Sequence, residues 1–548
     1  MSGPPPQDER VDRRAFLERM GAAVALGSGA SLPALETAGS PAQKQRAVSP
    51  PPEVDLPQVP DPTEFTLAEA AQAIRERSVS ADELCSAYLS RIQQHDPVLK
   101  AFNTVPEAEV RARALALDQT PRRGILHGIP LAIKDNYCTE GIATTANSLI
   151  FKDYVPDFDA TTVDRLKSQG AIIVGKTQMG PLATTRATTP DGTRTTVNAW
   201  AADDVSVSPG GSSSGSATAV AARLAASSTG TQTGGSITSP STAQGLTGLK
   251  PTMGRVSLNG VIPLTYTRDH PGPIARDAMD AAVMLQVMAG PDPRDPRTLG
   301  LPSVPDYVGA ATPVAEGQLR WPVTVGVIPD FLDAAPRQRA GQEPDEQEQA
   351  AARARAVARR EMLDTFGRLG ARTLEVEWPD QWETLTSFHF NNVRLPERTE
   401  PFLHYLKEDV RLFGVSLSPW INGLLLSGDE YLKGQRAKLA LLDRMLTSFF
   451  ERCDVVVLDS HLAFDIVGLP LMAFPIGFDD SSGRSLPIGG LIGGKPFGEE
   501  RLLSLVAGYQ AVTDHHKKRA PDPVSQAPGS QPEYPGRLDV FDVDREGQ

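Results

Sequence analysis

The chain has 548 residues, of which 40% are hydrophobic and 22% are charged, and its formal net charge is −13. This length provides a large core and would allow several domains. The acidic balance argues against a nucleic-acid partner, which would require a basic surface. Cys85, Cys138 and Cys453 are few and far apart, so the sequence shows neither a disulfide framework nor metal-ligand spacing.

The N-terminal region has a pattern typical of an export signal. Arg13 and Arg14 are close to a twin-arginine motif, and an uncharged, mildly apolar stretch follows from Met20 to Leu35. We therefore expect residues 1–38 to be a signal peptide read by the twin-arginine export machinery, which places the protein in the periplasm or outside the cell. A disordered tail with a chance arginine pair is the alternative. No stretch of the chain is long and apolar enough for a stable membrane span.

Proline-rich residues 39–62 are typical of an extended linker, and the folded domain is expected at residues 63–520. Capping-box patterns that begin at Thr66 and Ser80 predict two helix starts. Beyond them, buried strands alternate with helices, which indicates an α/β fold. The strands are expected at residues 131–133 and 171–174, and the helices at 217–226 and 278–288.

The rest of the chain continues the same alternation after an irregular stretch. Residues 291–345 are rich in Pro, Asp and Arg and are expected to form a loop or an insertion. The polar, proline-rich tail at residues 521–548 is expected to be disordered. Helical patterns are expected at 346–369, over most of 380–450 and at 499–513, and strands at 372–376, 454–458 and 486–493.

Two motifs suggest other functions but lack the required context. Residues 170–177 match a phosphate-binding loop, yet their Ala-Ile-Ile-Val centre predicts a buried strand. Residues 211–215 match the nucleophile elbow of α/β-hydrolases, but no apolar strand leads into Gly211. Neither motif therefore defines the function.

Three segments carry residues suited to acyl transfer. Lys134 follows the apolar run 131–133, and burial would lower the pKa of its amine so that the neutral form could act as a base. Its alternative role is to end a strand and pair with Asp135. The two loops at residues 209–216 and 230–236 are rich in Gly and Ser, and successive N–H groups in such a loop can hold an oxyanion or a phosphate.

Together these segments resemble the amidase signature family. The matching stretches are residues 127–136, 209–216 and 230–252, and shorter matches follow at 474–478 and 495–497. The resemblance implies a single α/β domain with a large mixed β-sheet flanked by helices on both faces. It also implies a serine hydrolase that cleaves small-molecule amides, with esters and carbamates as variants, without a metal or another cofactor.

The resemblance assigns catalytic roles to three residues. Lys134 would be the general base, Ser212 would relay the proton and follow a cis peptide bond, and Ser236 would be the nucleophile that forms the acyl-enzyme. The backbone N–H groups expected to form the oxyanion hole are those of Thr233, Gly234, Gly235 and Ser236. The residues expected to support the two loops are Gly211, Ser213, Gln232 and Thr238.

The chain departs from the family pattern at several positions. Gln232 stands where the family usually has Asp, and Thr238 stands where it usually has Arg, so a neutral hydrogen-bonded pair is expected in place of an ion pair. Ser214 replaces a glycine and would be strained if that position required a positive φ. These departures bear on the substrate, which the sequence does not identify, as it does not identify the oligomeric state.

Two other functions share the scaffold. One is an A-type amidotransferase component, which works in the cytoplasm with partner subunits; the expected signal and the acidic composition argue against it. The other is a non-catalytic binding protein, against which all three expected triad residues are present.

Overall fold

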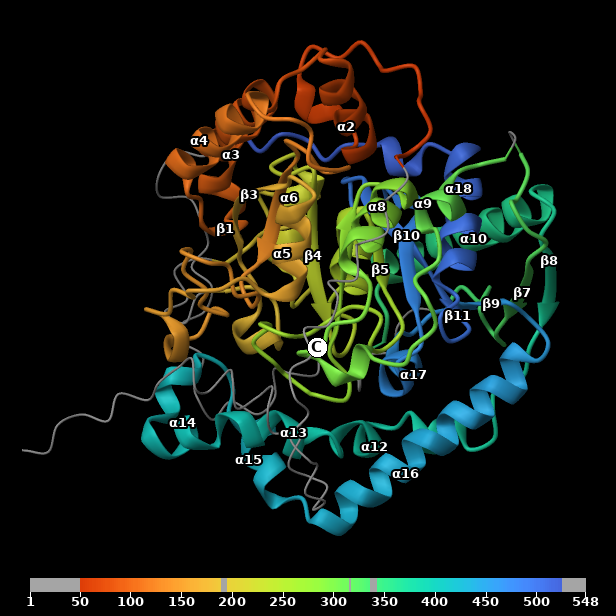
Figure 1. Ribbon diagram of the computed structural model, residues 1–548. Helices are drawn as coiled ribbons and strands as arrows, with labels where there is room; N and C mark the ends of the chain where they lie inside the picture. The colour runs from red at the N-terminus through yellow and green to blue at the C-terminus, as the bar shows by residue number, and fades with distance from the viewer. Residues whose placement is uncertain (1–49, 189–194, 315–316, 336–342, 525–548) are drawn as a thin grey trace, which may run out of the picture.

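The computed structural model describes residues 50–188, 195–314, 317–335 and 343–524 (Figure 1). Within these residues the core is one 11-stranded sheet, in the order β1-β3-β2-β4-β6-β5-β10-β11-β9-β7-β8. The strands are β1 (Phe102–Thr104), β2 (Pro130–Lys134), β3 (Ile172–Thr177), β4 (Ser227–Gln232), β5 (Thr247–Lys250), β6 (His270–Ala275), β7 (Thr324–Val327), β8 (Arg372–Glu375), β9 (Val455–Leu458), β10 (Leu471–Asp479) and β11 (Leu486–Gly494).

The sheet is mixed. Strand β2 runs parallel to both β3 and β4, and β7 runs parallel to both β8 and β9. Between these two parallel groups, β6, β5, β10 and β11 join through antiparallel pairs. A single sheet therefore runs through the whole domain, which confirms the expected fold class.

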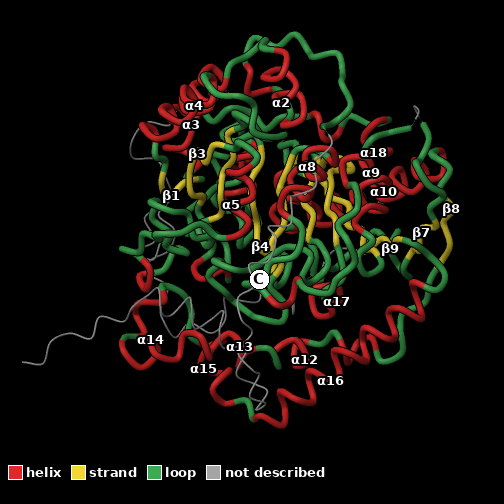
Figure 2. The backbone as a smooth tube through the Cα atoms, viewed as in Figure 1, coloured by secondary structure: helices red, strands yellow, loops and turns green. Residues whose placement is uncertain are grey.

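Helices cover both faces of this sheet (Figures 1 and 2). A side chain added at Gly489 of β11 would meet Thr242 of α7, whereas one at the next residue, Gly490, would meet Met362 of α10. Successive strand residues point to opposite faces, so α7 and α10 lie on opposite sides. The helices are α2 (Leu67–Glu76), α3 (Ala81–Leu99), α4 (Glu107–Asp118), α5 (Thr161–Ser168), α6 (Ser214–Ala221), α7 (Thr238–Gln244), α8 (Ala278–Met288), α9 (Tyr307–Ala311), α10 (Glu346–Arg368), α11 (Trp382–Leu385), α12 (Phe388–Asn392), α13 (Leu395–Thr399), α14 (Leu403–Glu408), α15 (Ser418–Leu425), α16 (Gly428–Met445), α17 (Leu462–Val467) and α18 (Glu499–Ala511).

Local sequence signals explain several helix starts. Thr66 and Ser80 each accept a hydrogen bond from the N–H group three residues later, and the glutamate at that position returns a bond to the cap, as expected for a capping box. Asp345 and Ser427 start α10 and α16 in the same way. Residues 380–450 are mainly helical, as expected, and α12 to α16 lie beyond one end of the strands in Figure 1.

Some expectations for individual segments are wrong. Residues 291–345 are not a loop throughout, because they contain α9 and the inner strand β7, a strand of four residues that lies between Pro322 and Pro329. Helix α6 begins and ends earlier than expected. Residues 172–177 form the fully buried strand β3, so the phosphate-loop motif is a strand, as the sequence predicted.

The ends of the chain limit what can be said of the expected segments. The expected signal at residues 1–38 lies outside the described residues, as do residues 39–49 of the linker and residues 525–548 of the tail. At the described end of the linker, Val54 exchanges two hydrogen bonds with Gln72 of α2. None of the helices in the described ranges combines the length and the apolar character that crossing a membrane requires.

Candidate active site

The three expected catalytic residues lie at the ends of neighbouring elements. Lys134 is the last residue of β2, and Ser236 lies between β4 and α7. Ser212 lies in the loop before α6, a helix that packs on both β2 and β4. Because β2 and β4 are adjacent parallel strands, their carboxyl ends bring Lys134 to the same edge of the sheet as residues 233–237, the loop of the expected nucleophile Ser236, called the nucleophile loop below.

Lys134 is completely buried and bonds to polar oxygens. Its Nζ donates to Ser212 Oγ at 3.0 Å and to Thr231 Oγ1 at 2.8 Å. Burial lowers the pKa of Lys134 to about 7, although the carboxylate of Asp269 opposes this shift. A large fraction of the amine is therefore neutral near pH 7, which a general base requires.

The alternative pairing of Lys134 with Asp135 is not formed. Asp135 instead pairs with the equally buried Lys176, with 3.3 Å between Oδ1 and Nζ. Its Oδ2 accepts hydrogen bonds from Asn103 and from the backbone and side chain of Thr145. Lys134 is thus free of any ion pair in the part of the chain that the structure describes.

The loop that carries Ser212 has a tightly constrained backbone. The Gly211–Ser212 peptide bond is cis. A side chain at Gly211 would collide with the carbonyl oxygen of Thr185, at 2.6 Å from the added Cβ. Ser213 Oγ lies 3.5 Å from the carbonyl oxygen of Thr231, at the limit of a hydrogen bond. Ser214 is the first residue of α6 and does not have a positive φ, so the strain considered for it is absent.

The loop that carries Ser236 turns sharply at Gly235, whose φ of +82° suits a glycine. Ser236 is 5% exposed. Thr233 Oγ1 donates to the carboxylate of the buried Asp269. The structure records no hydrogen bond between Ser212 and Ser236 among the described residues, so it brings Lys134 and Ser212 together without a direct bond onward to Ser236.

The expected oxyanion hole is only partly open. The Gly235 N–H group donates to Asp465 Oδ2 at 2.9 Å, so the prediction that this group faces an oxyanion is wrong for this structure. A carboxylate satisfies the donor and directs it away from a ligand. The N–H groups of Thr233, Gly234 and Ser236 form no hydrogen bond with other described residues, which leaves three donors for a bound oxygen.

Gln232 organises the same loop through a neutral network. Its Oε1 accepts the N–H groups of Ile237 and Thr238 at 2.8 and 2.9 Å, and the Thr238 hydroxyl at 3.2 Å. Its Nε2 donates to Asp465 Oδ1 at 2.8 Å. The two positions therefore form a neutral hydrogen-bonded pair, as expected from their side chains.

Asp465 and its partner His461 belong to the site but were not predicted from the sequence. Asp465 lies on the short helix α17, is completely buried and has an ion pair with Lys250, with 3.5 Å between Oδ1 and Nζ. Burial alone would raise the pKa of Asp465, but Lys250 and His461 hold it well below its usual range. Apart from His461, which lies four residues earlier, the partners of Asp465 come from β4, β5 and the nucleophile loop, so the sequence around this aspartate does not reveal its role.

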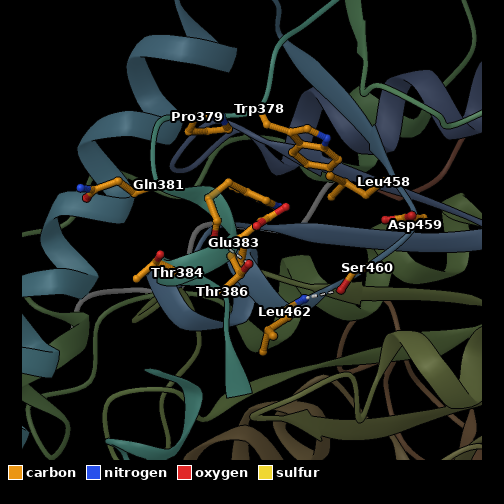
Figure 3. Close-up of a pocket in the computed structure, with 12 residues that line it drawn as sticks. Trp378, Pro379, Gln381, Glu383, Thr384, Thr386, Leu458, Asp459, Ser460 and Leu462 are labelled. Atoms are coloured by element: carbon orange, nitrogen blue, oxygen red, sulfur yellow. Dashed lines mark hydrogen bonds between the residues drawn. The ribbon is translucent and has the colours of Figure 1, made fainter. Parts of the chain in front are cut away.

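A cavity of about 670 Å³ lies on the other side of the first turn of α17 (Figure 3). Ser460 and Leu462 line it, whereas His461 between them packs against Gly235. The lining also includes Trp378 and Trp382, whose rings stack with centroids 4.7 Å apart. The cavity therefore adjoins the nucleophile loop through a single turn of helix.

Comparison with known proteins identifies the family. The model of the Amidase family matches residues 83–460, so the chain belongs to the amidase signature family, whose enzymes act on amides. Within the described residues, no group of His, Cys, Asp and Glu is arranged to hold a metal ion.

Relatives of two kinds are similar to the chain. The A-type component of glutamyl-tRNA(Gln) amidotransferase from Roseiflexus sp. (strain RS-1) is 33% identical over 84% of this chain and 98% of that protein. The protein of the same name from Nitrosococcus oceani is 32% identical over 83% of this chain and 98% of that protein. Among solved structures, native peptide amidase from Stenotrophomonas maltophilia has a TM-score of 0.68 and 28% identity, and the match covers 84% of this chain and 98% of the other.

These relatives correct the expected location. The expectation of a periplasmic or extracellular protein is wrong, because the chain matches A-type amidotransferase components, which are cytoplasmic, over nearly their whole length. The error arose because an arginine pair before a weakly apolar stretch is a short pattern that also occurs by chance. The family match begins only at residue 83.

Proposed function

We propose that the protein hydrolyses small carboxylic amides through an acyl-enzyme, with Lys134, Ser212 and Ser236 as the catalytic residues. One observation carries the proposal: a fully buried lysine places its Nζ 3.0 Å from the hydroxyl of Ser212, beside a glycine-rich loop that presents a second serine. A serine hydroxyl needs a neighbouring base to become a nucleophile, and a desolvated amine supplies one.

The proposed reaction follows from these contacts. Neutral Lys134 takes the proton of Ser212, and Ser212 takes that of Ser236 as its Oγ bonds to the amide carbon. The N–H groups of Thr233, Gly234 and Ser236 stabilise the negative oxygen. The proton returns along the same route to the leaving amine as the C–N bond breaks. Water then attacks the ester, and one of its protons restores the Ser236 hydroxyl as the acid is released.

A cationic Lys134 could not start this sequence. Its two closest partners are hydroxyl oxygens, which can donate as well as accept, so they satisfy the neutral amine as well as the charged one. The carboxylate of Asp269 acts on Lys134 without a hydrogen bond to its Nζ. This environment supports a lysine that changes protonation state near neutral pH.

The cavity beside α17 supports a substrate with an apolar or aromatic substituent. Its lining joins the indole rings of Trp378 and Trp382 to hydroxyl and carboxylate groups. We therefore propose that it receives one end of the amide, while the reacting carbonyl lies on the nucleophile loop across the turn. Aromatic rings bury a large area and give such a site its preference.

A component of an amidotransferase is the second candidate. It is favoured by 33% identity over 98% of the Roseiflexus relative. The acyl-enzyme chemistry would be shared, but the released ammonia would pass to an acceptor held with partner subunits. A purified chain that turns over simple amides without partners supports hydrolysis, whereas turnover of glutamine only after partner subunits are added supports the transferase.

The test uses Ser236→Ala with a matched control. Aliphatic, aryl and peptide amides are offered to the wild type, to Ser236→Ala and to Ser481→Ala, which removes an exposed hydroxyl in a distant turn. We expect Ser236→Ala to lose about 10³-fold or more in turnover while circular dichroism stays unchanged. The control should retain full activity. Wild-type turnover by folded Ser236→Ala would refute the proposal, and so would the failure of a serine-directed fluorophosphonate to label the wild type.

A further inference from the structure

Asp465 joins α17 to the nucleophile loop. Both of its oxygens are in use: Oδ1 accepts from Gln232 Nε2 at 2.8 Å, and Oδ2 accepts from the Gly235 N–H group at 2.9 Å. Gly235 directly precedes Ser236, so this carboxylate fixes the peptide next to the proposed nucleophile. The hydrogen bond spans 230 positions of the sequence.

The nucleophile loop and the residues next to it contain no charged side chain that could hold the Gly235 peptide in place of Asp465. Residues 230–238 contain only Gly, Thr, Gln, Ser and Ile. The buried carboxylate of Asp465 is balanced by Lys250, whose Nζ lies 3.5 Å from Oδ1 and also donates to the carbonyl oxygen of Phe464 at 3.0 Å. A buried charge without a partner is costly, so the pair must be kept together.

His461 completes the arrangement. Its Nδ1 lies 2.7 Å from Asp465 Oδ2, and an ionised carboxylate can only accept, so Nδ1 carries the proton. Its ring packs on Gly235, where an added Cβ would lie 2.6 Å from Nε2. The His461 side chain is 33% exposed, so it closes this network on the open side of the site.

Other charged groups surround the network without replacing Asp465. Arg268, before β6, contributes to lowering the pKa of Asp465, and Lys438 of α16 contributes to lowering the pKa of Lys250. His270 of β6 is buried next to Lys250, and burial together with that charge lowers its pKa and keeps it neutral. Asp465 is the carboxylate that bonds to a backbone N–H group of residues 233–236 in the described structure.

We propose that Asp465 is a positioning residue of the active site, which holds the nucleophile loop in its reactive shape through Gly235 and Gln232, with Lys250 and His461 as the partners that fix the carboxylate. This inference rests on the proposed role of Ser236. The bond to Gly235 sets the orientation of the adjoining peptide groups, which present the remaining N–H donors to the oxyanion. Lys250 keeps the negative charge of Asp465 from opposing the charge that develops there.

The decisive experiment exchanges the carboxylate of Asp465 and the side-chain amide of Gln232. Asp465→Asn, Gln232→Glu and the double variant Gln232→Glu/Asp465→Asn each keep the size of the side chains. The measured quantity is the rate at which a fluorophosphonate labels Ser236, with kcat and KM on the best amide as a second readout. In the double variant the carboxylate sits at 232 and the amide at 465, so their mutual hydrogen bond and the balance with Lys250 persist.

Each single change should slow labelling by about 10-fold to 100-fold, because a loop displaced by a fraction of an ångström loses its alignment. We expect kcat to fall while KM stays within about 3-fold, and the double variant to recover to within about 3-fold of the wild type. Wild-type labelling by Asp465→Asn overturns the proposal. So does a double variant no faster than the slower single one.

Two further variants keep the result interpretable. Should Asp465→Asn fail to fold, the labelling rate of the folded double variant still tests the proposal. The variant His461→Ala gives a second test, because it removes one hydrogen bond to the carboxylate of Asp465 while Lys250 stays in place. We expect His461→Ala to slow labelling several-fold, and an unchanged rate would exclude it as a partner. Ser236→Ala serves as the reference: if it labels like the wild type, the proposed function fails, whereas if only it loses labelling, the inference about Asp465 fails alone.

Discussion

Replacing Lys134 by Met should abolish turnover and change how the stability of the fold depends on pH. The change removes the proposed base, and an unbranched apolar side chain of similar length fills most of the space within the buried site. Turnover should fall about 10³-fold or more, because proposed triad members act as a unit. The same change should also alter how the stability of the fold depends on pH, in a direction that the burial of the amine determines.

The size of this effect follows from the two pKa values of Lys134. Its pKa is about 7 in the folded protein against an ordinary 10.5, so the unfolded chain binds one more proton between these values. The lysine therefore lowers stability at pH 7, and this penalty fades as pH rises toward 10.5. From pH 7 to pH 9 the wild type should gain about 2 kcal/mol relative to Lys134→Met, from about 1.7 units of pH at 1.36 kcal/mol each.

Urea unfolding of both proteins at pH 7 and pH 9 measures this difference. The difference between the two proteins in their change of unfolding free energy from pH 7 to pH 9 removes the contribution of every group that titrates equally in both. A positive change of about 2 kcal/mol supports an amine that is neutral in the fold. A change near zero, or a reversed sign, would show that Lys134 stays charged when buried, and that it is not the base.

Three further expectations test other parts of the site. The rate constant kcat/KM should rise with pH through about 7 and then level off as Lys134 loses its proton, and a profile that falls across that range contradicts the assignment. Asp135→Asn should lower the free energy of unfolding by about 3–5 kcal/mol, since it leaves the buried Lys176 without a carboxylate to balance its charge; thermal unfolding below the wild-type midpoint is the measurement. Gly235→Ala should abolish labelling of the active serine, because the added methyl meets His461 at a positive φ; a fully labelled variant would mean that the loop tolerates a shift.

The parts of the candidate site that are local in the chain could be predicted from the sequence. Lys134 at the end of an apolar run and the glycine-rich loop before Ser236 are visible because burial and backbone geometry limit which residues can stand there. The alternation of strands and helices likewise indicated an α/β fold, and the resemblance to the amidase signature family implied its mixed sheet with helices on both faces. What escaped were relations across long separations. The pairing of Asp135 with Lys176 in place of Lys134, and the capture of the Gly235 N–H group by Asp465, depend on how distant segments pack.

The bond between Gly235 and Asp465 has a consequence for how the enzyme is made. Synthesis proceeds from the N-terminus, so the lysine and both serines leave the ribosome more than 200 residues before the aspartate does. Until α17 is added and docks beside β5, the emerging chain holds a nucleophile loop without its anchor. Under the role proposed for Asp465, fragments that end before α17 keep Lys134 and both serines but hold the nucleophile loop without the hydrogen bond that orients Gly235.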